Sequence, residues 1–261
     1  MGPSLKSQPQ AQDEPEPGRD RRSDHRSAIN RRRSDLDEGA WIDISLAIEA
    51  GSVPWSGLRG PRLSWEAQID RGDAVNVGRL ELSLHTATHA DAPRHVLAEG
   101  ADIASVDVTP YLGEVLLVRV ADVAVLDQSC FASAGVQPSG DLPSRLLVAT
   151  DRPFDGRCFP ETVIPLAPEA ARWLMSLGIR LIGLDQPSVD PLDSKQLESH
   201  HILLGGGARI IENLDLRGIP AGRYDLVAVP LRIPGADASP VRALLRRRPT
   251  AGGATVLDVS A

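Results

Sequence analysis

Apolar and polar residues alternate in two early segments of the chain. From 42 to 46, Ile, Ile and Leu alternate with Asp and Ser, and from 80 to 84 three Leu residues alternate with Glu and Ser. Because successive side chains of a strand point to opposite faces, both segments predict half-buried strands. The second predicted strand runs directly into a group of histidines.

Further along, the chain carries compact apolar runs of strand length. These are 115–120, 146–150, 179–184 and 224–233, the last of them interrupted by Pro230. Residues 168–177 predict a helix, because Pro168 suits its first turn and Gly178 its end. Many strands with few helices favour a mixed, strand-rich α/β fold, and no repeat or second domain is evident.

The amino-terminal segment has a different composition. Residues 1–39 hold few apolar side chains, and their eight basic residues are matched by eight acidic ones. Such a segment cannot bury enough surface to offset its ordering entropy, so we predict a disordered polar tail before a folded domain over 40–261. An arm that binds nucleic acid through the local Arg cluster is the alternative, and it predicts salt-dependent binding that is lost on deleting the tail.

Whole-chain properties narrow the class of protein. A chain of 261 residues with 42% apolar residues can bury a sizeable core, and its net charge of −7 gives no general attraction to nucleic acid. No run approaches the ~18 apolar residues of a membrane span, and no signal-peptide pattern is found. Cys130 and Cys158 form no CxxC pair and no disulfide framework, so we expect a cytoplasmic protein.

A dense cluster of possible metal ligands follows the second predicted strand. His85, His89, Asp91 and His95 fall within eleven residues. Imidazole nitrogens and carboxylate oxygens are ligands that zinc, manganese or iron select, and one carboxylate can touch two ions about 3.5–4 Å apart. Position 86 is Thr, so this is not the helical HExxH motif, and we expect the cluster where a strand ends and a loop begins.

A second cluster lies more than a hundred residues later. Glu212 falls within the apolar, strand-like run 209–216, where a carboxylate needs solvent or a polar partner, either a metal or Arg209. His200 and His201 are adjacent and would point to opposite sides of an extended segment, so we expect only one of them to bind metal. We predict that both clusters meet around a shared pair of cations.

These segments resemble the bacterial kynurenine formamidase family of cyclase-like metal hydrolases. The string at 85–95, His-Thr-Ala-Thr-His-Ala-Asp-Ala-Pro-Arg-His, resembles the family signature, and 183–191 and 239–243 extend the likeness over about 41–246. The resemblance implies a swivelling β/β/α fold, a homodimer, and hydrolysis of an aromatic amide. The implied reaction converts N-formyl-kynurenine to kynurenine and formate in tryptophan catabolism.

The resemblance also implies a role for each site residue. Two divalent cations, zinc or alternatively manganese, would be bound by His85, His89 and Asp91 at one site and by Asp91, His200 and Glu212 at the other. His95 would be the general acid and base, and Trp55 would line the substrate pocket.

Two residues depart from the family pattern. Ala87 replaces a glycine, so the loop must avoid positive φ or carry strain. Arg94 replaces an apolar residue, and we raise the hypothesis that it holds a substrate carboxylate, against the simpler alternative that it points to solvent.

Other functions stay open at this stage. A related cyclase-like hydrolase could open another amide, lactam or ester, such as isatin. A protein that binds metal without catalysis is a further alternative, although structural zinc sites are often rich in thiolates and both cysteines lie outside the clusters. No Gly-x-Ser-x-Gly elbow is present, which argues against a serine hydrolase.

Overall fold

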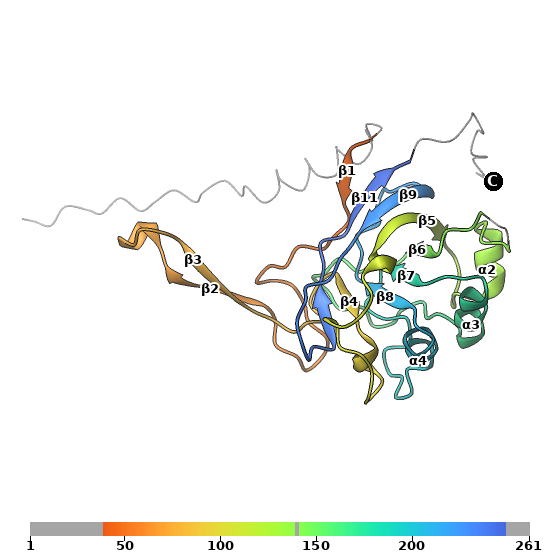
Figure 1. The fold of residues 1–261 in the computed structure, drawn as a ribbon, viewed down its shortest axis with the longest axis horizontal. Coiled ribbons are helices and arrows are strands. Elements are labelled where there is room, and N and C mark those ends of the chain that lie inside the picture. The colour runs from red at the N-terminus through yellow and green to blue at the C-terminus, as the bar shows by residue number, and fades with distance from the viewer. Residues whose placement is uncertain (1–38, 139–140, 249–261) are drawn as a thin grey trace, which may run out of the picture. The chain divides into compact units, whose positions relative to one another are not determined.

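A nine-stranded sheet dominates the computed structural model, which describes residues 39–138 and 141–248 (Figure 1). In sheet order its strands are β1 (Trp41–Asp43), β11 (Leu244–Arg247), β9 (Gly222–Val227), β5 (Leu112–Val120), β6 (Arg145–Thr150), β7 (Leu181–Leu184), β8 (Arg209–Glu212), β4 (His89–Asp91) and β10 (Ala238–Pro240). The pairs β5–β6, β6–β7 and β7–β8 are parallel, and the remaining pairs in the sheet are antiparallel. The predicted mixed, strand-rich α/β class is confirmed.

Three helices cover one face of the parallel strands. They are α2 (Gln128–Ser133), α3 (Pro168–Ser176) and α4 (Glu198–Gly205), and they lie together in Figure 1. Val118, Val148 and Ile182 are buried in the same apolar cluster as side chains of these helices. Short 3₁₀ turns at Ile69–Arg71, Pro93–His95 and Thr109–Tyr111 complete the described elements.

The opposite face of the sheet encloses a second core. Leu117 and Leu147, each one position away from a helix-facing residue, pack there with Ile211. Ala90 of β4 and Leu245 of β11 belong to the same cluster, although these strands lie near opposite ends of the sheet. The sheet must therefore curl around this core, which brings its two ends toward each other.

A separate two-stranded hairpin corrects one prediction. Strands β2 (Arg62–Ala67) and β3 (Val77–Glu81) pair only with each other, and β3 ends before the histidine segment. The alternating Leu residues at 80–84 predicted a half-buried strand. The strand ends at Glu81 and every residue of β3 is exposed, whereas residues 82–84 are half-buried but not in a strand. The alternation correctly indicated a strand as far as Glu81. Its apolar side chains are exposed because β2 and β3 pair only with each other within the described chain.

Most other predicted elements are found. The runs at 115–120 and 146–150 lie within β5 and β6, the run at 179–184 contains β7, and the predicted helix is α3. The last predicted strand ends at Val227, well before Ile233. The predicted tail lies outside the described residues except for Gly39, and no helix within the described ranges is long and apolar enough to cross a membrane.

Candidate metal centre

Strands β4 and β8 supply the floor of the site. His89 and Asp91 are two residues apart on β4, so they share a face, while Ala90 between them points into the core. Glu212 lies opposite His89 in the antiparallel ladder, and its Oε2 is 3.5 Å from Nε2 of His89. The backbone ladder therefore sets the spacing of these three side chains.

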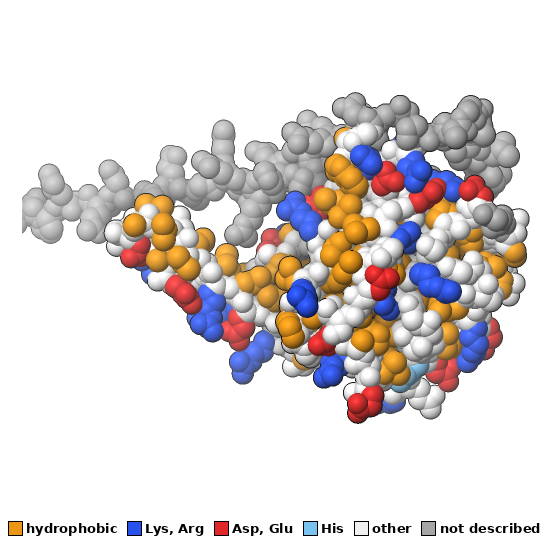
Figure 2. Space-filling view, in the orientation of Figure 1, with side chains coloured by type: hydrophobic (Ala, Val, Ile, Leu, Met, Phe, Trp, Pro, Cys, Tyr) orange, Lys and Arg blue, Asp and Glu red, His pale blue; other side chains and the backbone are white. Residues whose placement is uncertain are grey.

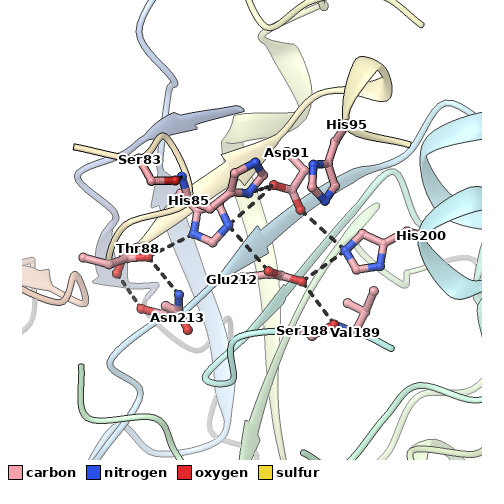
Figure 3. Close-up of polar contacts among 12 residues, drawn as sticks. Ser83, His85, Thr88, Asp91, His95, Ser188, Val189, His200, Glu212 and Asn213 are labelled. Atoms are coloured by element: carbon pink, nitrogen blue, oxygen red, sulfur yellow. Dashed lines mark hydrogen bonds and ion pairs between the residues drawn. The ribbon is translucent and has the colours of Figure 1, made fainter. Parts of the chain in front are cut away.

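Helix α4 brings His200 onto the same face of the sheet. Its Nε2 lies 3.3 Å from Oε1 of Glu212 and 3.7 Å from Oδ2 of Asp91 (Figure 3). His200 is buried and His201 is exposed, so only one of the adjacent pair faces the site. The segment is helical, and the extended geometry considered from sequence is wrong for it.

Two further histidines lie above this floor. His85 occupies the turn before β4, with Nδ1 3.1 Å from Oδ1 of Asp91. The ring of His95, from the 3₁₀ turn after β4, has its centroid 4.3 Å from that of His85 and 5.7 Å from that of His200. The predicted meeting of the two sequence clusters is confirmed, whereas the role of each residue stays a prediction.

In His85, His89 and His200, the ring nitrogen that points away from the centre of the site has a polar partner. Nδ1 of His89 lies 2.9 Å from the carbonyl oxygen of Ala87, and Nδ1 of His200 lies 2.7 Å from Oδ2 of Asp190. His85 places Nδ1 beside Asp91 and Nε2 3.0 Å from Oδ2 of Asp237. A partner on the outer nitrogen fixes the tautomer and turns the other nitrogen inward, as in metal-ligating histidines.

Asp190 also fixes the start of α4. Its two carboxylate oxygens accept the backbone N–H groups of Ser199 and His200, both at 3.0 Å. One buried carboxylate thus satisfies the helix amino terminus and orients the His200 ring. Sequence reasoning assigned no role to Asp190; the available signal was its position directly before Pro191, in a segment that also resembles the family.

Asp237 is the residue that sequence reasoning missed altogether. It directly precedes β10, whose Ala238 pairs with Asp91, and its carbonyl oxygen accepts the backbone N–H of Ala92 at 2.9 Å. Its Oδ2 lies 3.5 Å from Nδ1 of His95. The contacts with His85 and His95 hold the pKa of the Asp237 carboxyl well below its usual range.

Ala87 adopts the strained conformation that the sequence left open. Its φ is 55°, in the left-handed region that favours glycine. The conformation turns its carbonyl oxygen toward both Nδ1 of His89 and the side-chain amide of Asn213, at 2.9 and 3.0 Å. The strained backbone at Ala87 therefore places the carbonyl oxygen that orients His89, a candidate metal ligand.

The donor set fits a divalent cation. Asp91 Oδ1, Asp91 Oδ2 and His89 Nε2 are buried, and none has a hydrogen-bond partner within the described part of the chain. Orphaned buried polar atoms are costly unless an ion or water satisfies them. Carboxylate oxygens and imidazole nitrogens that converge from three elements supply the ligand types of a zinc or manganese site.

The pKa values of His85 and His200 are shifted by the negative charge around the site, whereas that of His89 is shifted by burial. Burial lowers the pKa of His89, and it also disfavours the charged form of His85, but the contacts with Asp237 and Asp91 raise the pKa of His85 to about 10. Burial likewise opposes a charged His200, yet Asp190, Asp91 and Glu212 raise its pKa. Burial would raise the pKa of Asp91, but His200 and His85 hold it well below its usual range.

The remaining predicted residues lie near the site or on the surface. Trp55 is half-buried with its ring 5.2 Å from that of Phe159, which in turn packs against Phe154 and Ala87. An aromatic cluster thus adjoins the histidine loop. Arg94 is exposed, and the alternative partner Arg209 bonds to the carbonyl oxygens of Gly207 and Ala208 rather than to Glu212.

Comparisons with known proteins agree with this geometry. Residues 42–191, more than half of the chain, match the cyclase family, described as putative cyclase. Kynurenine formamidase of Salinibacter ruber is 39% identical over 80% of this chain and 99% of that protein, and the enzyme of Bacillus cereus is 38% identical over 79% and 97%.

Solved structures give the same fold. A potential metal-dependent hydrolase with cyclase activity superposes with a TM-score of 0.68 at 29% identity, covering 80% of this chain and 99% of that one. Isatin hydrolase A of Labrenzia aggregata, bound to benzyl benzoate, superposes with a TM-score of 0.66 at 20% identity, covering 85% and 97%. The fold, the paired His and Asp clusters and nearly full-length relatives together place this chain in the cyclase family, among the kynurenine formamidases.

Proposed function

We propose that this protein is a metal-dependent hydrolase that converts N-formyl-kynurenine to kynurenine and formate. The observation that carries the proposal is the buried, unsatisfied Asp91 carboxylate between His89 and His200. Its two oxygens face different histidines, which is the arrangement a carboxylate needs to bridge two cations. The nearly full-length relatives named kynurenine formamidase support the choice of substrate.

We propose two divalent cations, zinc or alternatively manganese, because their charge balances the negative charge of the site. Four carboxylates converge there (Asp91, Asp190, Glu212 and Asp237), giving 4 × −1 = −4, and two divalent ions supply 2 × +2 = +4. His85, His89 and Asp91 would hold one ion, and Asp91, His200 and Glu212 the other. When bound, such ions lower the pKa of water and polarise a carbonyl oxygen.

His95 is the proposed general acid and base. It lies within the ligand cluster, yet its side chain is 27% exposed, more than that of any floor residue. A half-buried imidazole beside the reacting groups can take a proton from water and give one to the aryl amine that leaves.

The substrate's aromatic ring would lie against Trp55. The edge-on packing of Trp55, Phe159 and Phe154 forms an apolar, aromatic wall beside the loop that holds the histidines. Such a wall suits an aryl amide and gives no advantage to a small aliphatic one. Arg94 is a candidate for the substrate carboxylate; Arg94→Ala should then raise KM, and an unchanged KM would remove the idea.

The decisive test measures metal content and formate release together. We expect about two zinc or manganese ions per chain and stoichiometric formate from N-formyl-kynurenine, with far slower opening of isatin. Faster isatin opening would move the proposal to a lactam hydrolase. A full metal complement without turnover of either compound would support the non-catalytic alternative.

We propose that the enzyme works as a homodimer joined through the β2–β3 hairpin. Leu63, Trp65 and Leu80 share one face of the hairpin and are 62%, 47% and 50% exposed, while Arg79 and Glu66 form an ion pair 3.5 Å long on the other. Figure 2 shows hydrophobic and charged side chains on separate margins of this arm. An isolated two-stranded hairpin is only marginally stable in water, so its exposed apolar face is a suitable surface for a second copy of the chain.

Light scattering tests the dimer directly. We expect a dimer mass for the wild type, a monomer for Leu63→Lys, and an unchanged dimer for Arg79→Ser on the charged face. A monomeric wild type, or a dimer that survives Leu63→Lys and Trp65→Lys together, would remove the assignment.

A cytoplasmic role in tryptophan breakdown completes the proposal. Cys130 and Cys158 are both free thiols, one of them exposed, which suits a reducing compartment. Residues 1–39 remain a predicted polar tail.

A further inference from the structure

One carboxylate touches both a candidate metal ligand and the candidate proton-transfer residue. Oδ2 of Asp237 lies 3.0 Å from Nε2 of His85 and 3.5 Å from Nδ1 of His95. The rings of His85 and His95 are also in contact, with centroids 4.3 Å apart. Within the described residues, the contact with Asp237 is the shortest polar contact of the His95 ring.

The backbone holds Asp237 in place for this contact. The N–H of Ala92 donates to the Asp237 carbonyl oxygen, and the next residue, Ala238, pairs with Asp91. Asp237 thus continues the ladder that positions the floor, while its side chain remains 42% exposed. A carboxylate on a rigid strand end can orient a ring without blocking access to it.

We propose that Asp237 is a positioning residue that holds His95 with Nδ1 protonated and Nε2 turned toward the reacting atoms. The inference rests on the proposed function only for the identity of the reaction. It adds a carboxylate–histidine pair, Asp237–His95, to the proposed active site. The same Asp237 carboxylate also contacts the ring of His85. The 3.5 Å separation closes to a hydrogen bond with a small rotation of either side chain, as is common before a substrate binds.

Asp190 offers a matched control. It is also a carboxylate bonded to the outer nitrogen of a candidate ligand, His200, at 2.7 Å, but it has no contact with His95. Asp190→Asn and Asp237→Asn therefore both disturb a ligand histidine, and only Asp237→Asn should disturb His95.

The test combines a spectrum with a double-mutant cycle on the zinc-loaded enzyme. With ¹⁵N-labelled histidine, the His95 signal, identified by its loss in His95→Ala, should report an Nδ1–H tautomer in the wild type. Asp237→Asn should shift that signal and lower kcat about 10- to 100-fold with little change in KM. Asp190→Asn should leave the signal unchanged.

The cycle separates positioning from a general loss of metal. In the His95→Ala background, Asp237→Asn should lower kcat by less than 3-fold, because the residue it positions is gone. Asp237→Glu, which keeps the charge, should restore part of the wild-type kcat. An unshifted His95 signal, or an equal loss of kcat in both backgrounds, would overturn the proposal; the spectrum needs no substrate, so it stands apart from the formate assay.

Discussion

The floor and the rim of the site differ in burial and in what their atoms lack. The floor (His89, Asp91, His200 and Glu212) is at most 5% exposed at its side chains and carries orphaned polar atoms. The rim (His85, His95 and Asp237) is 18%, 27% and 42% exposed at its side chains. A cation satisfies buried orphans, whereas proton exchange needs access, so the difference separates the four most buried candidate ligands from His95, the candidate for proton transfer. His85 belongs to the rim by its exposure, although its proposed role is metal binding.

The largest effect should come from removing the centre of the floor. Asp91→Ala deletes both orphaned oxygens, so we expect loss of bound metal and a fall in kcat of at least about 10³-fold. Metal analysis by mass spectrometry and formate release measure the two effects. Retention of both ions by this variant would break the division between floor and rim.

A rim substitution should separate the two properties. His95→Ala is expected to keep the full metal complement while kcat falls about 10²- to 10⁴-fold, because general acid–base transfer is lost. The same two measurements apply. Near-wild-type turnover, or a parallel loss of metal, would show that His95 has a different role.

A buried carboxyl without a histidine partner sharpens the comparison. Burial raises the pKa of Asp185 to about 7, although Thr150 donates both its N–H and its hydroxyl to it. The folded state therefore keeps a proton that the unfolded state loses above about pH 4, so this group lowers stability as pH rises from about 4 to 7. Asp91, facing histidines, shows the opposite direction.

Asp185→Asn tests that sign. The variant should gain stability relative to the wild type across this pH window, by up to about 4 kcal/mol, and no further above it. Denaturant unfolding at pH 4, 5.5, 7 and 8 measures the difference, in which the titrations common to both proteins cancel. A difference that is independent of pH would contradict the raised pKa.

The smallest effect concerns the loop that supports the floor. Ala87→Gly relieves a left-handed alanine worth about 1–2 kcal/mol but removes a buried methyl worth about 0.8 kcal/mol and frees the unfolded chain. We expect a net change in unfolding free energy within about 1 kcal/mol of zero. Ala87→Val should destabilise clearly, because a β-branched residue resists positive φ; equal stability of both variants would argue against the observed φ.

Local apolar patterns predicted the interior of the sheet well. The runs that became β6 and β7 are almost wholly buried, and the run in β5 is buried apart from Leu116 and Arg119, so their apolar composition alone indicated strands. The alternation at 80–84 predicted the wrong boundary, because the strand ends at Glu81, and Leu80 is exposed because alternation does not report whether another element covers the apolar face. The short strands β10, at one edge of the sheet, and β11, next to the edge strand β1, were not predicted.

The site was predicted in part for a similar reason. Dense ligands at 85–95 stand out in any sequence, and the meeting with His200 and Glu212 followed from the types of residue and the family resemblance. Asp237 stands alone among small residues, and only the pairing of Ala238 with Asp91 brings it to the histidines. Long-range strand register is the information that a single sequence does not display.

The placement of β4 has a consequence for how the enzyme is made. This three-residue strand is flanked by β8, about 120 residues later, and by β10, later still. During synthesis, the first ligands leave the ribosome long before either neighbouring strand exists, and such non-local pairing forms slowly. The nascent chain therefore cannot assemble the centre from its first ligands alone; the site can form only after β8 and β10 have been synthesised.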